Sequence, residues 1–399
     1  MPPRKRKISS NTASSDISVR PQSPNITTVP VRPRIENVLQ GIQPGLETIS
    51  TRPQHRIFFR HPGYPAPNNI LLVVPAPDHP SGGLHHDTAL TACGIVSGNR
   101  WDGWFTQNLD GPRIDIGPDE ILLAGNYYFH LPRSESDPPY GIVPCFRQWV
   151  FPHGKLPRTW MQSLIAEADR PIASLSNYTA DVTSRDVSCR ICAFSEGVQV
   201  AHIAPRNELN WFFANGMGQY FRSCMAINMD DTGNCLLLRA DLHTSFDARK
   251  FIFVPKGTTS KSPSFVTHII EISTILASLY QNVALQPLIN IPVEFLFVRF
   301  AWAIFPYLEQ FFMGAEENIG VLVNSKYERT TPEKGRQLIK DSASRPQTPK
   351  TPVSPGIPNT HAASPLQSIS GDYIDLPPPC DCYSEIYASG ANTKCGLCG

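Results

Sequence analysis

The chain has 399 residues, enough for a sizeable core, but only 41% are hydrophobic and 39 are prolines, so ordered segments are expected to alternate with extended ones. Its 35 basic and 34 acidic residues leave a net charge of +1, which excludes an argument for nucleic-acid binding from overall charge. Ten cysteines without an N-terminal apolar stretch argue against a secreted disulfide scaffold and predict an intracellular protein.

Residues 1–54 are rich in serine, threonine and proline. Because so polar a segment cannot offset the entropy of ordering, we predict a disordered tail. It contains the basic run from Arg4 to Lys7, which we interpret as a nuclear localisation signal; a solvated charge cluster is the alternative. The sequence therefore predicts a nuclear protein.

Residues 55–158 predict a β-rich module, because short β-type runs are separated by glycine and proline turns. Three of these runs are Arg56 to Phe59, Ile70 to Val74 and Tyr127 to Phe129. The adjacent pair His85 and His86 does not favour a metal site, because neighbouring side chains on a strand point to opposite faces.

Residues 159–261 form the third predicted segment and contain the most informative motifs. It opens with a helical pattern from Thr159 to Asp169. Apolar and polar residues then alternate from Val198 to His202, which predicts a strand, and Pro205 would end it. At a strand end, His202 is expected to face a cleft.

A short helix is predicted downstream, with Asp241 as its N-cap. His243 and Asp247 are four residues apart, so they share one face of that helix and could bind a divalent metal ion. Asn234 is expected in the loop before the helix, where its carboxamide could hydrogen-bond an imidazole or a backbone carbonyl.

A strand-end histidine, a loop asparagine and a helical histidine in this order resemble the ββα-metal motif of HNH endonucleases. The resemblance covers Ser188 to Lys256, and it is closest to a variant with an Ala-His-Ile strand and an Asp-Leu-His…Phe-Asp helix. Flanking pieces such as Asn99 to Gly103 and Arg299 to Phe305 are similar to those of fungal proteins that carry this domain, so the wider match spans His55 to Phe312.

The resemblance implies a metal-dependent endonuclease that hydrolyses phosphodiester bonds of nucleic acid, with DNA as the expected partner and RNA left open. His202 would be the general base, and Asn234 would fix the loop and orient that base. His243 and Asp247 would hold a divalent metal, Mg²⁺ or Mn²⁺, with Zn²⁺ as a further candidate.

Two departures from the family pattern keep an alternative open. Ala201 occupies the position before the base, where the family often has a metal ligand. Weak metal affinity or lost catalysis would follow, and the protein would then be an inactive HNH-like nucleic-acid-binding or interaction protein.

Cys189 and Cys192 have zinc-ligand spacing but no second pair beside the helix, so buried free thiols are favoured over a structural zinc. Arg206 and Arg239 could reach phosphates.

Residues 262–325 predict a helical packing segment. The first helix follows from the helical spacing of Ile269, Ile272, Ile275, Leu276 and Leu279. The second is expected from Val293 to Phe312, and we predict that it is buried in protein and not in a membrane, because Arg299, Pro306 and Glu309 interrupt it.

Residues 326–399 are predicted to be a second disordered tail, with Ser-Pro and Thr-Pro dipeptides that suit proline-directed kinases. Four cysteines near its end could bind one zinc ion or stay unpaired: Cys380, Cys382, Cys395 and Cys398. The predicted fold class is thus α+β: a β-rich N-terminal module, then a ββα-metal (HNH) module with packed C-terminal helices, between disordered tails.

Overall fold

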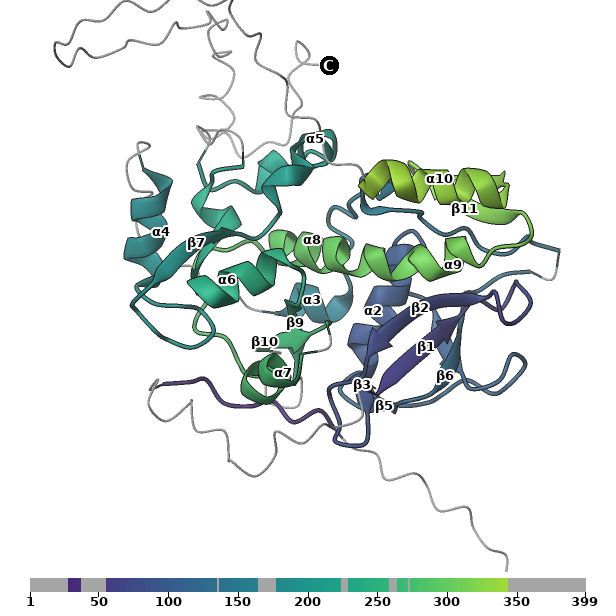
Figure 1. Ribbon diagram of the computed structural model, residues 1–399, viewed down its shortest axis with the longest axis horizontal. Coiled ribbons are helices and arrows are strands. Elements are labelled where there is room, and N and C mark those ends of the chain that lie inside the picture. Colours follow the sequence, from purple (N-terminus) through teal and green to yellow (C-terminus); the bar gives the residue numbers. More distant parts are fainter. Residues whose placement is uncertain are drawn as a thin grey trace, which may run out of the picture. The chain divides into compact units, whose positions relative to one another are not determined.

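The computed structural model describes residues 28–36, 55–134, 136–163, 177–223, 229–257, 264–271 and 273–343 (Figure 1). These lie within one compact unit, Met1–Pro346, and their fold is mixed α+β, as predicted. The basic run from Arg4 to Lys7 and the C-terminal cysteines lie outside the described residues.

A four-stranded sheet forms the N-terminal module, in the order β2-β1-β6-β4. Its strands are β1 (Arg56–Arg60), β2 (Ile70–Pro75), β4 (Trp104–Thr106) and β6 (Asn126–His130). β1 is antiparallel to β2 and parallel to β6. Ile57 and Phe59 are fully buried because alternate residues of β1 face the core. The three predicted β runs are confirmed.

A second, two-stranded sheet joins β3 (Gly83–His85) to β5 (Ile121–Leu123), and helix α2 (His86–Val96) follows β3 directly. The prediction of a β-rich module missed this helix. α2 is buried on nearly every side, so it lacks the polar stripe that marks a surface helix. His85 caps it by accepting a hydrogen bond from the Thr88 amide.

The central segment contains the two strands and the helix that matter most for function. β7 (Val198–His202) pairs antiparallel with β8 (Cys235–Arg239), with His202 opposite Cys235. α6 (Ala240–Asp247) follows β8 without a loop. The predicted strand at Val198 to His202 is confirmed, and β8 is the second strand of the ββα module that the family resemblance implied.

Several short helices surround this ribbon. They are α3 (Arg158–Gln162), α4 (Tyr178–Asp186), α5 (Leu209–Ala214) and the 3₁₀ turns at Phe146–Gln148, Arg206–Glu208, Met217–Tyr220 and Thr232–Asn234. The helix predicted from Thr159 to Asp169 is present as α3, and residues 164–176 lie outside the described part of the chain.

Downstream, β9 (Phe251–Lys256) and β10 (Ser264–Ile269) form an antiparallel ribbon, followed by α7 (Thr274–Tyr280). Ile269 therefore ends a strand, and the helix predicted to include it was placed too early. The prediction failed because β10 is buried almost throughout, and a buried strand has no alternation to separate it from a helix.

A long helical segment runs across the middle of the view in Figure 1. It consists of α8 (Val293–Ile304), the 3₁₀ turn η5 (Phe305–Leu308) and α9 (Glu309–Met313). Pro306 lies at the break between the two α-helices, where it would remove a helical hydrogen bond. Ten of the twelve residues of α8 are buried, which agrees with the predicted packing helix. Among the described residues, no helix has the length and apolar character needed to cross a membrane.

The chain does not become irregular at residue 326, where the C-terminal tail was predicted to begin. β11 (Ile319–Val323) and β12 (Lys326–Thr330) form a hairpin, and α10 (Pro332–Ala343) packs on α9 and β11. β12 is almost entirely exposed, so its polar sequence hid a strand that is held by hydrogen bonds to β11.

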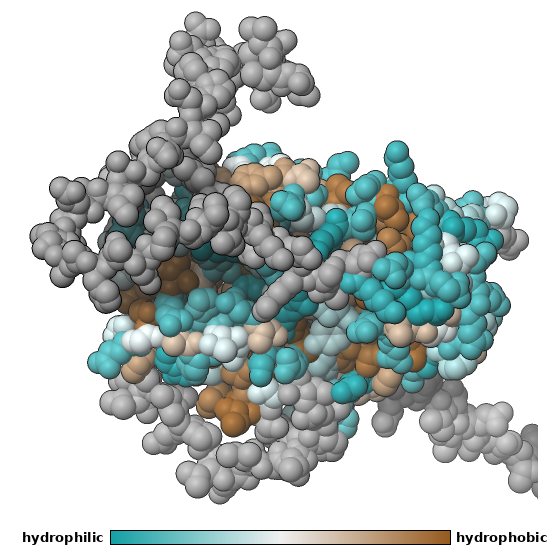
Figure 2. Space-filling model, turned by 45° about the horizontal axis from the view of Figure 1, so that its top comes forward, coloured by the Kyte–Doolittle hydropathy of each residue, from teal (hydrophilic) through white to brown (hydrophobic). Residues whose placement is uncertain are grey.

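The face drawn in Figure 2 is mostly hydrophilic, and its hydrophobic surface is divided into separate patches. The large exposed apolar side chains come from distant parts of the chain, including Phe213, Ile275 and Met313. Scattered apolar residues of this kind are ordinary on a folded protein.

Candidate functional site

The candidate site lies where α6 packs against β7. The chain passes directly from β8 into α6, and α6 then runs beside β7. His243, in the middle of α6, donates a hydrogen bond from Nδ1 to Gln199 Oε1 of β7 at 2.9 Å. One turn later, Asp247 lies near the end of β7, because Arg299 contacts both its carboxylate and the His202 carbonyl. His243 and Asp247 thus lie beside β7, and Arg299 links the Asp247 carboxylate to the backbone of His202.

His202 ends β7 with its side chain 14% exposed. Its Nε2 lies 2.9 Å from Asp230 Oδ1, and the Tyr178 ring is 6.0 Å away between centroids. Burial lowers the pKa of His202 below its ordinary value, and the hydrogen bond and charge of Asp230 oppose that shift only in part. The imidazole is therefore held in its neutral form near neutral pH.

His243 and Asp247 form the second half of the site. His243 Nε2 lies 3.2 Å from Asp247 Oδ2, and the two side chains are 22% and 60% exposed. Burial opposes ionisation of Asp247, but the hydrogen bond from His243 and the charge of Arg299 outweigh it and lower its pKa. An ionised carboxylate and an imidazole nitrogen this close can contact one divalent ion together.

Further protein ligands do not join this pair: among the described residues, no three His, Cys, Asp or Glu side chains gather closely enough to hold a metal. The donor set nevertheless fits a catalytic ion, which keeps positions open for water and substrate. It does not fit a closed structural site. Ala201, at the position before His202, is fully buried.

Asn234 lies in the 3₁₀ turn before β8 and not, as predicted, in a loop directly before the helix. Its side chain is fully buried. Oδ1 accepts a hydrogen bond from the Ala204 amide at 2.8 Å, and Nδ2 donates to the Met229 carbonyl at 3.1 Å. Asn234 thus clamps the backbone just beyond His202 through peptide groups, and its contacts there do not involve the imidazole.

Asp241 does not cap α6, in contrast to the prediction. The N-cap position is Arg239, and Asp241 lies in the first turn, where its carboxylate pairs with Arg239 at 2.6 Å. Arg239 is at the opposite end of the ribbon from His202, since it pairs with Val198. Arg206, by contrast, is 56% exposed and pairs with Asp230 at 3.2 Å, so it lies beside the site.

Among the described residues of this segment, the cysteines are buried thiols. Cys189, Cys192 and Cys235 are each at most 3% exposed and not in disulfides. A hydrogen bond from Cys192 lowers the pKa of the Cys189 thiol to about 6, against the opposing effect of burial, and the pKa of Cys192 is raised. Cys189 also contacts the Arg239 backbone, which lies at the end of the β7–β8 ribbon opposite His202.

Three residues of the site were not found from the sequence: Gln199, Asp230 and Arg299. Asp230 is 28 positions from His202 and Arg299 is 97 positions from it. The acidic pair Asp230 and Asp231 shortly before Asn234 was a visible signal, although sequence alone does not tell which carboxylate meets the imidazole. A charged residue inside an apolar helix was the corresponding signal for Arg299.

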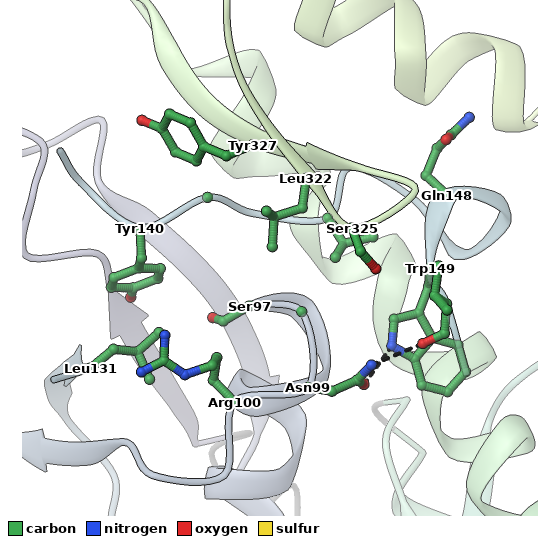
Figure 3. Close-up of a pocket in the computed structure, with 14 residues that line it drawn as sticks. Ser97, Asn99, Arg100, Leu131, Tyr140, Gln148, Trp149, Leu322, Ser325 and Tyr327 are labelled. Carbon is green, nitrogen blue, oxygen red and sulfur yellow. Dashed lines mark hydrogen bonds between the residues drawn. The ribbon is translucent and has the colours of Figure 1, made fainter. Parts of the chain in front are cut away.

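A separate cavity of about 340 Å³ lies between the loop after α2 and the β11–β12 hairpin (Figure 3). Ser97 Oγ and Gln148 Oε1 are buried there without a hydrogen-bond partner. Asn99 is already occupied, because it donates to the Val150 carbonyl and accepts from Trp149 Nε1. The residues that line this cavity do not include those of the His202 site.

The comparisons with known proteins agree with this geometry. A family model described as HNH endonuclease matches residues 189–254. No curated protein and no solved structure matches the chain. The matched segment includes β7, β8 and α6, and with them His202, Asn234, His243 and Asp247. Residues 189–254 therefore match the HNH endonuclease family, in agreement with the resemblance predicted from the sequence.

Proposed function

We propose that this protein is a metal-dependent HNH-type endonuclease that hydrolyses phosphodiester bonds of nucleic acid, with DNA as its substrate. One observation carries the proposal. The largely buried imidazole of His202 lies at the end of β7, and beside this strand His243 and Asp247 lie 3.2 Å apart. A general base next to a two-ligand metal position is the minimum that such a hydrolysis requires.

His202 is proposed as the general base. When Nε2 donates its hydrogen to Asp230, the tautomer is set and Nδ1 becomes the nitrogen that accepts a proton from water. The lowered pKa of His202, caused by burial, keeps the ring unprotonated and able to act. Asp230 is thus a positioning residue for the base.

His243 and Asp247 are proposed to hold a divalent ion, Mg²⁺ or Mn²⁺, with Zn²⁺ as a further candidate. When bound, the ion supplies positive charge that stabilises the phosphate oxygens and the leaving group. Gln199 orients the His243 ring through Nδ1, which directs Nε2 toward Asp247. Arg206 is exposed beside Asp230 and is proposed to contact a neighbouring phosphate.

The second candidate function is an inactive HNH-like nucleic-acid-binding or interaction protein. The buried Ala201 favours it, because this position supplies no third ligand and weak metal binding would follow. Both candidates suit the nucleus, the location that we propose from the basic run at Arg4 to Lys7.

Nicking of supercoiled plasmid with Mg²⁺ or Mn²⁺ separates the two functions. We expect wild-type protein to nick and His202→Ala to lose about 10²–10⁴-fold in rate, the usual contribution of a general base. His243→Ala should lose activity that excess metal restores in part. His79→Ala, outside residues 189–254, is the control and should cleave like wild type.

Equal product yield from wild type and His202→Ala would exclude catalysis by this site. Salt-dependent binding of DNA without cleavage would support the second function.

A further inference from the structure

Arg299 is a buried cation that reaches the site from outside the family segment. It lies in α8, 45 positions beyond the end of the match at residue 254, and only 1% of it is exposed. Its Nη2 donates to the His202 carbonyl at 2.8 Å and approaches Asp247 Oδ1 at 3.3 Å. Nη2 of Arg299 thus connects the backbone of His202, the proposed general base, to the carboxylate of Asp247, a proposed metal ligand.

The Arg299 guanidinium keeps its positive charge although its burial is energetically unfavourable. The guanidinium carbon lies 3.7 Å from the Phe246 ring centroid and 4.9 Å from that of Trp302. Nε and Nη1 are buried without a hydrogen-bond partner, which is unfavourable for a polar group. Burial lowers the pKa of Arg299 to about 10, so the side chain remains charged at neutral pH.

The contacts also divide the two oxygens of Asp247 between two tasks. Oδ1 faces Arg299, whereas Oδ2 faces His243 Nε2 at 3.2 Å. Rotation of the carboxylate would break one of these contacts. Arg299 therefore fixes which Asp247 oxygen is turned toward the position proposed for the ion. Its hydrogen bond to the His202 carbonyl also holds the guanidinium at the end of β7.

We propose that Arg299 is a positioning residue that sets the placement of the His243–Asp247 pair relative to His202. The contribution of Arg299 to catalysis rests on the proposed endonuclease function. Its effect on the placement of these side chains is independent of that function. Arg299 touches neither the reacting water nor the phosphate, because its side chain is buried.

A purely structural role is the competing explanation, and Arg249 provides a matched control for it. The Arg249 guanidinium lies 3.7 Å from the centroid of the same Trp302 ring, so Arg249→Met removes a stacked cation from this cluster and leaves the contacts of Arg299 with the site in place. Arg299→Met removes both the stack and the contacts. Arg299→Lys keeps the charge but loses the planar fork.

The experiment uses the full chain in four forms: wild type, Arg299→Met, Arg299→Lys and Arg249→Met. Three properties are measured on each form: the Mn²⁺ dissociation constant, the imidazole NMR signals of His202 and His243 without metal, and the thermal unfolding midpoint. We expect Arg299→Met to weaken Mn²⁺ binding by about 10- to 100-fold and to shift or broaden both imidazole signals. Arg249→Met should lower the unfolding midpoint while its Mn²⁺ affinity stays within about twofold of wild type.

Arg299→Lys should fall between wild type and Arg299→Met, and it replaces the methionine variant should that variant not fold. The inference is overturned if both arginine positions change Mn²⁺ affinity and the imidazole signals equally, or if folded Arg299 variants change neither. Wild-type protein that neither binds Mn²⁺ nor cleaves plasmid would refute the proposed function alone. The imidazole signals of the metal-free variants would still decide whether Arg299 positions these side chains.

Discussion

His202 shows how a single side chain acquires its chemical character from neighbours that are distant in sequence. Its position at a strand end was predicted from alternation and from Pro205, and the structure agrees. Its partner Asp230 was not predicted, because the contact depends on the path of the 28 residues between them. Sequence patterns report local periodicity, whereas this pairing arises from tertiary folding.

At this scale we predict that Asp230→Asn extends activity to lower pH. Asp230 raises the pKa of His202 against the lowering effect of burial, so removal of its charge should lower that pKa further. Since the base must be neutral, the acidic limb of the pH–rate profile should move to lower pH. The plateau rate should fall by about 10²-fold or less, because the imidazole itself remains.

NMR titration of His202 in the same variant measures this pKa without any need for cleavage. The linkage has a defined sign: a histidine whose folded pKa lies below its unfolded value contributes stability that is lost as pH falls through and below about 6.5. Asp230→Asn should increase that loss. An acidic limb or a titration midpoint that moved to higher pH would contradict the assigned role of Asp230.

Among the structural elements, β7 and α8 could be predicted from periodicity, but β8 and α2 could not. β8 is apolar throughout and four of its five residues are buried, so its sequence lacks the alternation of a half-exposed strand. α2 is hidden by burial in the same way. The ββα arrangement was therefore reached through family resemblance, and the local pattern supplied only its first strand and the helix.

Asn234 joins two of these elements, and we predict that its replacement destabilises the fold. Asn234→Ala leaves the Ala204 amide and the Met229 carbonyl without their buried partner. The free energy of unfolding should fall by about 1–3 kcal/mol, as measured by urea denaturation. Asn234→Asp, which turns a buried carboxylate oxygen toward the Met229 carbonyl, should lose at least as much. A folded Asn234→Ala protein of wild-type stability would show that this clamp is dispensable.

Across the whole molecule, a buried polar cluster connects the N-terminal module to the β9–β10 ribbon. Lys256 Nζ of β9 donates to Asp78 Oδ1 at 2.7 Å and to Asn282 Oδ1 at 2.9 Å, and Asp78 also accepts from the His85 amide. Burial opposes ionisation of Asp78, but Lys256 outweighs it and lowers the pKa. Residues 55–158 and 159–261 were predicted as separate domains, and such side-chain contacts between them are invisible to composition.

We predict that Lys256→Met destabilises the protein by about 3–5 kcal/mol, because it leaves a buried carboxylate without its counter-charge. Urea unfolding at neutral pH measures the loss. The half-exposed Lys250, which pairs with Glu271 at 3.7 Å, is the control, and Lys250→Met should change stability by about 0.5 kcal/mol or less. The double variant Asp78→Asn/Lys256→Met should lose less than the sum of the single changes; strict additivity would show that the pair is not coupled.

The origin of Arg299 in α8 limits how this nuclease-like unit can be exchanged between proteins. A gene fragment that encodes only residues 189–254 would carry the imidazoles and the carboxylate but leave behind the arginine that links the His202 carbonyl to the Asp247 carboxylate. Recombination would have to transfer the chain as far as α8 to transplant the assembled centre. Inheritance of this centre is therefore tied to sequence well beyond the recognisable motif.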